Sequence, residues 1–117
     1  MVDKAQADPT ESLLLELRRG VLVLGVLAQL RKDAYGYALK RALGVLGLDI
    51  DEGTLYPLLS RLRVQGLVSA RLEESSEGPA RKYYALTEPG RAIMKAMNEY
   101  LDNLSRGTRK LQERSMT

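Results

Sequence analysis

The chain has 117 residues and a formal net charge of +3, from 18 basic and 15 acidic side chains. It contains neither Cys nor His, which excludes the thiolate and imidazole chemistry behind most nucleophilic triads, structural zinc sites and haem ligation. We therefore expect that the protein is not an enzyme and that it binds no metal or cofactor. A composition of 44% hydrophobic and 28% charged residues is typical of one soluble globular domain.

The first twelve residues are polar and acidic, and they contain neither the basic nor the apolar segment of a secretory signal. The longest apolar stretch, Val21 to Leu30, is interrupted by Gln29 and has about half of the roughly 20 residues that a membrane-spanning helix needs. The absence of Cys agrees with a reducing compartment. The sequence thus predicts a soluble, cytoplasmic protein with no membrane partner.

A long first helix is predicted from about residue 8. Asp8 is a suitable N-cap, Pro9 suits the first helical position, and Glu11 lies where it would complete a capping box. Apolar residues then recur at steps of three and four, and further leucines widen the stripe, so we expect burial against more than one neighbour. The stripe comprises Leu13, Leu14, Leu15, Leu17, Val21, Leu22, Val23, Leu24, Leu27 and Ala28.

Two shorter helices are predicted next. The second helix covers about residues 35–46, and Gly47 ends it. Residues 48–50 are too few for more than a bridge or a very short strand. The third helix begins after Asp51, a good N-cap, carries leucines at helical spacing, and ends at Gly66.

From Leu67 the apolar period changes to two, which predicts a β-hairpin. Its strands cover about residues 67–73 and 81–86. The connection, Glu74–Ala80, is rich in Ser, Gly and Pro, which predicts a mobile polar tip. Thr87 then suits the N-cap of a last helix, with Pro89 tolerated in its first turn.

Apolar side chains on the last helix form a seam, at Ile93, Met97, Tyr100, Leu104 and Leu111. The seam covers about two heptads, fewer than the three or four that are typical of a free-standing coiled coil. It agrees equally well with packing on the chain's own domain and with a subunit contact. The chain ends, up to Ala7 and after about Gly107, are expected to fray.

The predicted order is three helices, a two-stranded hairpin and a last helix. This order is typical of a winged helix-turn-helix, whose hairpin reaches along DNA beside the recognition helix. The fold class is therefore mainly α with a small β-hairpin: a winged helix-turn-helix over residues 8–86 plus a C-terminal helix over residues 87–112, in one compact unit. This last helix is a dimerisation helix if its seam is a subunit contact. Some winged helices bind only proteins, so the order alone leaves DNA binding open.

The third helix has one apolar and one polar side. At 100° per residue, one side holds Leu55, Leu58, Leu59 and Leu62, and the other holds Gly53, Pro57, Ser60 and Val64, flanked by Tyr56, Arg61 and Arg63. Arginine binds guanine or phosphate, and hydroxyl groups donate to phosphate oxygens, so the polar side suits a DNA groove. Taken alone, two arginines on a helix are more often a solvated surface. Pro57 lies inside this helix, so a kink or an irregular first turn is expected.

The hairpin adds a second basic element. Arg81 and Lys82 directly follow the predicted tip, where contacts with phosphate or the minor groove could form. Three glutamates near the tip, Glu73, Glu74 and Glu77, would repel phosphate unless they point away or pair with arginine. The partners within reach would be Arg71 and Arg81. We therefore expect the tip itself to contribute little affinity.

The chain resembles the PadR family of bacterial transcriptional regulators in four segments that occur in the family's order. Two carry its recognition-helix and wing motifs: GTLYPLLSRLRVQGLV (Gly53–Val68) and GPARKYYALTEPG (Gly78–Gly90). Two are similar to its opening helix and to the Gly-Tyr start of its second helix: LRRGVLVLGVLAQL (Leu17–Leu30) and YGYALKRAL (Tyr35–Leu43). The likeness covers about residues 17–104, and four motifs at the right spacing are highly specific.

The resemblance implies a homodimeric winged-helix repressor whose partners are double-stranded DNA and a second copy of the chain, joined through the first and last helices. Together with the helix face described above, it makes the DNA-binding candidates Tyr37, Thr54, Tyr56, Pro57, Ser60, Arg61, Arg63, Arg81 and Lys82. The dimerisation candidates are Leu17, Val21, Leu24, Ile93, Met97, Tyr100 and Leu104. Tyr37 could equally be a half-buried core residue.

Two departures from the family pattern bear on an effector. The chain stops after one C-terminal helix, so it resembles the short branch of the family. It also lacks Trp and Phe, so an aromatic sandwich around a flat ligand could be built only from Tyr, and Tyr100 is the sole aromatic residue of the last helix. A small-molecule effector stays open and unidentified.

The leading hypothesis is a sequence-specific repressor that acts as a homodimer on a near-palindromic operator, with recognition helices in major grooves about one helical turn apart. The alternative is a winged-helix module that binds only proteins, through its apolar first and last helices. An enzyme would need converging carboxylates or a lysine, whereas Glu73 and Glu74 are neighbours on a strand and point to opposite faces.

Overall fold

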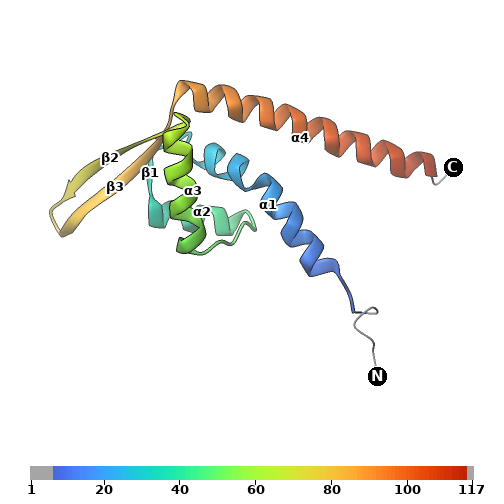
Figure 1. Cartoon of the computed structure of the whole chain (residues 1–117), viewed down its shortest axis with the longest axis horizontal. Helices are drawn as coiled ribbons and strands as arrows, with labels where there is room; N and C mark the ends of the chain where they lie inside the picture. Colours follow the sequence, from blue (N-terminus) through green and yellow to red (C-terminus); the bar gives the residue numbers. More distant parts are fainter. Residues whose placement is uncertain (1–6, 116–117) are drawn as a thin grey trace.

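The computed structural model describes residues 7–115 (Figure 1). The described elements are α1 (Thr10–Gln29), β1 (Ala34–Tyr35), α2 (Gly36–Val45), α3 (Glu52–Val64), β2 (Val68–Ser75), β3 (Gly78–Leu86) and α4 (Glu88–Ser115). The predicted class, mainly α with a winged helix-turn-helix and a long C-terminal helix, is confirmed. Residues 1–6, for which the sequence predicts fraying, lie outside the described residues.

The core lies where the second half of α1, α2, α3 and the base of the sheet meet. Leucines at the predicted helical spacing fill it, because each helix turns one apolar stripe inward. Its most completely buried side chains are Val26, Leu27, Leu30, Leu39, Leu43, Leu55, Leu59, Leu62 and Val68. Tyr84 of β3 closes the core on the side of the sheet and is 6% exposed.

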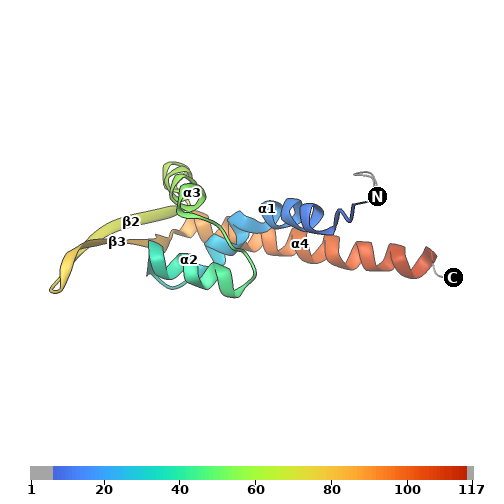
Figure 2. The same cartoon turned by 90° about the horizontal axis from the view of Figure 1, so that it is seen from below.

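As predicted, α1 packs against more than one neighbour, namely α2 and α4, but in the single chain this burial is confined to part of the helix. Its second half is buried, but Leu14 is 50% exposed and Leu17 is 63% exposed. Figures 1 and 2 show why: the first half of α1 and most of α4 extend beyond the core, and in Figure 1 the two helices diverge. At the start of α1 the N-cap residue is Pro9 rather than the predicted Asp8, and the Asp8 carboxylate accepts a hydrogen bond from the Thr10 amide (3.0 Å).

The boundaries of α2 agree with prediction, but the very short strand lies elsewhere. Gly47 ends the helix with a φ of +84°, and the Leu48 amide donates back to the Leu43 carbonyl (2.9 Å). No strand forms at residues 48–50, where Leu48 is buried against Gly25 of α1. The strand is β1, just before α2, where Tyr35 pairs with Tyr83 along the free edge of β3.

Both ends of α3 form as predicted. The Asp51 carboxylate accepts a hydrogen bond from the Thr54 amide (2.8 Å), and Gly66 follows the helix with a φ of +79°. The helix is continuous through Pro57. Proline omits only the bond to the Gly53 carbonyl, and Gly53 lies in the exposed first turn.

The sheet is antiparallel, in the order β1-β3-β2, so the predicted hairpin gains a third, short strand. The predicted connection Glu74–Ala80 is wrong, because the strands continue outward until Ser75 pairs with Gly78. A bulge between Glu73 and Ser75 takes up the change of register near the tip. The wing is therefore a long paired ribbon with a two-residue turn.

The last helix begins as predicted and ends later. Thr87 caps it, since its hydroxyl accepts a hydrogen bond from the Gly90 amide (3.1 Å). The expected fraying after Gly107 is wrong: α4 continues to Ser115, although one glycine inside a helix costs about 1 kcal/mol. An ion pair between Arg106 and Asp102 (3.1 Å) supports the turn before this glycine. No helix in the described part of the chain is long and apolar enough to cross a membrane.

Candidate nucleic-acid interface

The outer side of α3 is the polar surface that the sequence predicts. The four leucines assigned to the inner side are all buried: Leu55, Leu58, Leu59 and Leu62. The DNA-binding candidates on this helix are all exposed: Thr54, Tyr56, Pro57, Ser60, Arg61 and Arg63. The structure therefore brings these six candidates together on one helix.

The charge on this surface is positive and uncompensated. Neither Arg61 nor Arg63 forms an ion pair with any residue between positions 7 and 115. The only acidic residue of α3 is Glu52, at the helix N-terminus, where it opposes the helix dipole favourably. Both guanidinium groups are thus free to bind phosphate or a guanine edge.

Tyr56 lies at the junction of three elements. Its ring packs against Gly36, the first residue of α2, where a Cβ atom would lie 2.7 Å from the ring carbon Cε1. Burial raises the pKa of Tyr84 on β3, the nearby Tyr56 hydroxyl raises it further, and the Arg63 guanidinium lowers it. Tyr56 is 40% exposed, so it joins α3 to α2 and the sheet while keeping an accessible edge.

Tyr37 is not a core residue. It lies on the first turn of α2, is 55% exposed, and has the Arg41 guanidinium 5.9 Å from its ring centroid. Tyr37 is therefore exposed beside an arginine, and its contact with phosphate stays a prediction.

The predicted basic pair of the wing is divided between the two faces of the sheet. Lys82 is opposite Leu72 in the ladder, on the face that continues from the buried residues Val68 and Tyr84. Arg81 is on the other face, with its guanidinium 4.8 Å from the ring centroid of Tyr35. The two side chains therefore cannot act on one phosphate together.

A network on that second face holds β1 to the wing. The Arg71 guanidinium donates to the Asp33 carboxylate (2.6 Å) and lies 3.7 Å from a Glu73 carboxylate oxygen. The hydrogen bond to Asp33 is the main cause of a raised pKa for Arg71. Arg71 also stacks over Tyr83 (5.3 Å), whose ring centroid is 5.7 Å from that of Tyr35.

The network settles part of the question about the acidic wing. Glu73 pairs with Arg71, as the sequence allowed, and it also lies opposite Arg81 in the ladder. The sequence did not reveal Asp33 or Tyr35, because a two-residue strand shows no period. Among the described residues, no three acidic side chains are grouped so that they could hold one metal ion.

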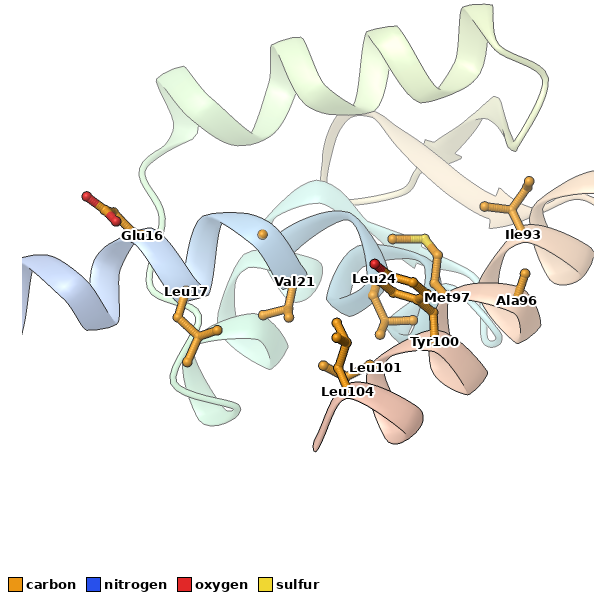
Figure 3. Close-up of a pocket in the computed structure, with 11 residues that line it drawn as sticks. Glu16, Leu17, Val21, Leu24, Ile93, Ala96, Met97, Tyr100, Leu101 and Leu104 are labelled. Atoms are coloured by element: carbon orange, nitrogen blue, oxygen red, sulfur yellow. The ribbon is translucent and has the colours of Figure 1, made fainter. Parts of the chain in front are cut away.

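All the dimerisation candidates line a groove between α1 and α4 (Figure 3). Its volume is about 560 Å³, and its lining is almost entirely apolar. Leu17, Val21 and Leu24 line it from α1, and Ile93, Met97, Tyr100 and Leu104 from α4. Several of them are open to solvent, above all Tyr100, which is 68% exposed.

Comparison with known proteins agrees with the fold. Residues 23–96 match the Transcriptional regulator PadR-like family. The PadR family transcriptional regulator from Eggerthella lenta is 41% identical, with a TM-score of 0.85 over 95% of this chain and 98% of that chain.

Two curated relatives are similar over a shorter stretch. Transcriptional regulator Rv3488 from Mycobacterium tuberculosis is 34% identical over 63% of this chain and 68% of its own length. An uncharacterized protein from Lysinibacillus sphaericus is 34% identical over 56% of this chain and 62% of its own length, so the match spans a little under two thirds of that protein. The chain belongs to the PadR-like family of transcriptional regulators.

Proposed function

We propose that the chain is a sequence-specific repressor that binds a near-palindromic operator as a homodimer. The observation that carries this proposal is the outer side of α3, where Arg61 and Arg63 are exposed and unpaired within the described chain. In a winged helix-turn-helix this helix lies in the major groove, and the wing follows the adjacent backbone. Lys82, on the face of the wing that continues from the core, is then the wing's phosphate contact.

Dimerisation is supported by the groove between α1 and α4. Monomeric proteins seldom leave a contiguous apolar surface of this kind open, and such a surface marks a contact with another molecule. The groove is lined from α1 and α4, and each of these helices carries several exposed apolar residues, so α4 of a second copy is the occupant that we infer. A flat aromatic effector would meet one aromatic ring per subunit in this groove, that of Tyr100.

The alternative, a module that binds only proteins, would use the same groove. It gives no reason for the two uncompensated arginines on α3 or for the Tyr56 side chain beside them. The DNA-binding proposal accounts for both surfaces at once, because α3 would contact DNA and the groove would join the two subunits.

Replacing Arg61 by Ala tests the DNA-binding surface. We expect the variant to bind operator DNA about tenfold or more weakly, because a specific arginine contact is worth about 1–3 kcal/mol. The free energy of unfolding should change by less than about 0.5 kcal/mol, since Arg61 is exposed and unpaired in the described chain. The measurement is fluorescence anisotropy on an operator selected by the wild-type protein from random-sequence DNA.

Lys95→Ala is the matched control, because Lys95 is an exposed cation on α4 and does not line the groove. It should bind the operator like the wild type. Equal affinities of the wild type and Arg61→Ala would remove Arg61 from the interface.

A further inference from the structure

The end of α3 is bonded directly to the start of α4. The Thr87 hydroxyl donates to the Gly66 carbonyl (2.6 Å), and the Thr87 amide donates to the Leu67 carbonyl (3.2 Å). Gly66 and Leu67 are the first residues beyond the C-cap of α3, and Thr87 is the N-cap of α4. One residue therefore holds the helix that presents Arg61 and the helix that lines the groove.

Gly90 allows the start of α4 to lie in close contact with the segment that follows α3. It is buried in the first turn of α4, and a Cβ atom there would overlap the carbonyl oxygen of Leu67 and lie 2.7 Å from Leu86 Cδ1. Since any side chain other than hydrogen would collide with backbone, α4 cannot approach α3 in this way with another residue at position 90. The same Thr87 hydroxyl accepts the Gly90 amide (3.1 Å), so it organises both contacts.

The end of α1 is held at the same place. Leu30, the C-cap of α1, accepts a hydrogen bond from the Leu86 amide (3.2 Å), one residue before Thr87. We call these residues the joint: Leu30, Gly66, Leu67, Leu86, Thr87 and Gly90. The joint links both helices that line the groove to the C-terminal end of the candidate recognition helix.

We propose that the joint sets the spacing of operator half-sites that the dimer accepts, with Thr87 as the positioning residue. This rests on the proposed function, because it needs two copies joined at the groove and two α3 helices on DNA. One base pair moves a half-site by about 3.4 Å and turns it by about 35°. A dimer can reject such a change only if each α3 is held firmly relative to α4, and the bonds of Thr87 provide that hold.

Thr87→Val isolates this role, because valine keeps the shape of threonine and removes the hydroxyl that bonds to Gly66 and Gly90. The affinities of the full-length chain are measured for a set of duplexes with the selected operator's half-sites one and two base pairs closer or farther apart. For the wild type we expect about a tenfold loss per base-pair change, as for a mismatched operator position. For Thr87→Val we expect a loss below about threefold, or a different preferred spacing.

Two controls separate positioning from simple destabilisation. Thr87→Ser retains the hydroxyl and should restore the wild-type spacing preference. Leu39→Val lowers stability from a buried position on α2 outside the joint and should leave the spacing preference unchanged. If Thr87→Val weakened binding by the same factor at every spacing, as a destabilised protein does, the proposal would be overturned. If the wild type bound one half-site as well as two, dimeric operator binding would fail, and the spacing proposal with it.

Discussion

Leu17→Glu is expected to convert the proposed dimer into a monomer and to lower operator affinity about 100-fold or more. Leu17 lines the groove and is 63% exposed in the single chain. A glutamate side chain at this position therefore stays hydrated in the monomer, and the chain still folds. In a dimer the same side chain would be covered by the second copy, and an unpaired buried carboxylate is strongly unfavourable. The loss of DNA affinity follows because a protein that binds two half-sites through linked subunits has an affinity about 10²–10⁴-fold higher than one that binds a single half-site.

The mass in solution, from light scattering on a sizing column, checks this prediction directly. One chain has a mass of 13.0 kDa, and the wild type should have twice that mass. Val45→Glu is the control, because Val45 is 89% exposed on α2 and does not line the groove. This control should stay dimeric. A Leu17→Glu protein of wild-type mass would show that the groove is not the subunit contact.

Gly90→Ala is expected to lower the free energy of unfolding by about 3 kcal/mol, the upper end of the range for overpacking a buried position. The added methyl group would meet the carbonyl oxygen of Leu67, and backbone cannot move aside as a flexible side chain can. Either α4 shifts as a whole or the cap at Thr87 is lost.

Urea denaturation at one fixed protein concentration measures this effect, because the stability of the proposed dimer would depend on concentration. Gly78→Ala is the matched control, since a Cβ atom at the wing tip would meet no atom within 4 Å. Its free energy of unfolding should change by less than about 0.5 kcal/mol. If Gly90→Ala and Gly78→Ala had equal free energies of unfolding, the close approach of Gly90 to the Leu67 carbonyl would not restrict the residue at position 90.

The sequence was most informative about α3, because the signals that define this helix are local. A capping aspartate, leucines at helical spacing and a glycine beyond the end lie within sixteen residues, from position 51 to 66. Each acts through neighbours along the chain, so no knowledge of the tertiary structure was needed. The same periodicity separated the buried leucines from the outer side that carries Arg61 and Arg63.

Other features depend on contacts between distant residues, and the sequence could not show them. The periodicity of α1 indicated an apolar stripe but not whether its own chain or a second copy covers that stripe, so the exposure of Leu17 came only from the structure. The pairing of Tyr35 with Tyr83 joins segments that no local pattern connects. The Ser, Gly and Pro residues near the wing tip suggested a loop, yet cross-strand pairing extends to Ser75 and Gly78.

The bonds of the joint were also invisible in the sequence. Thr87 was recognisable as an N-cap, but its second bond, to the Gly66 carbonyl, depends on the path of the chain through the wing. Gly90 similarly has no unusual φ and shows its importance only through the Leu67 carbonyl beside it.

The salt dependence of operator affinity tests most directly whether this protein acts by binding DNA through the cations of α3 and the wing. With two phosphate contacts per subunit of a dimer, the logarithm of the affinity should fall against the logarithm of salt concentration with a slope of about −4. The titration uses the wild-type chain and its selected operator between low and physiological salt. An affinity that stays constant over this range would contradict DNA binding through these cations.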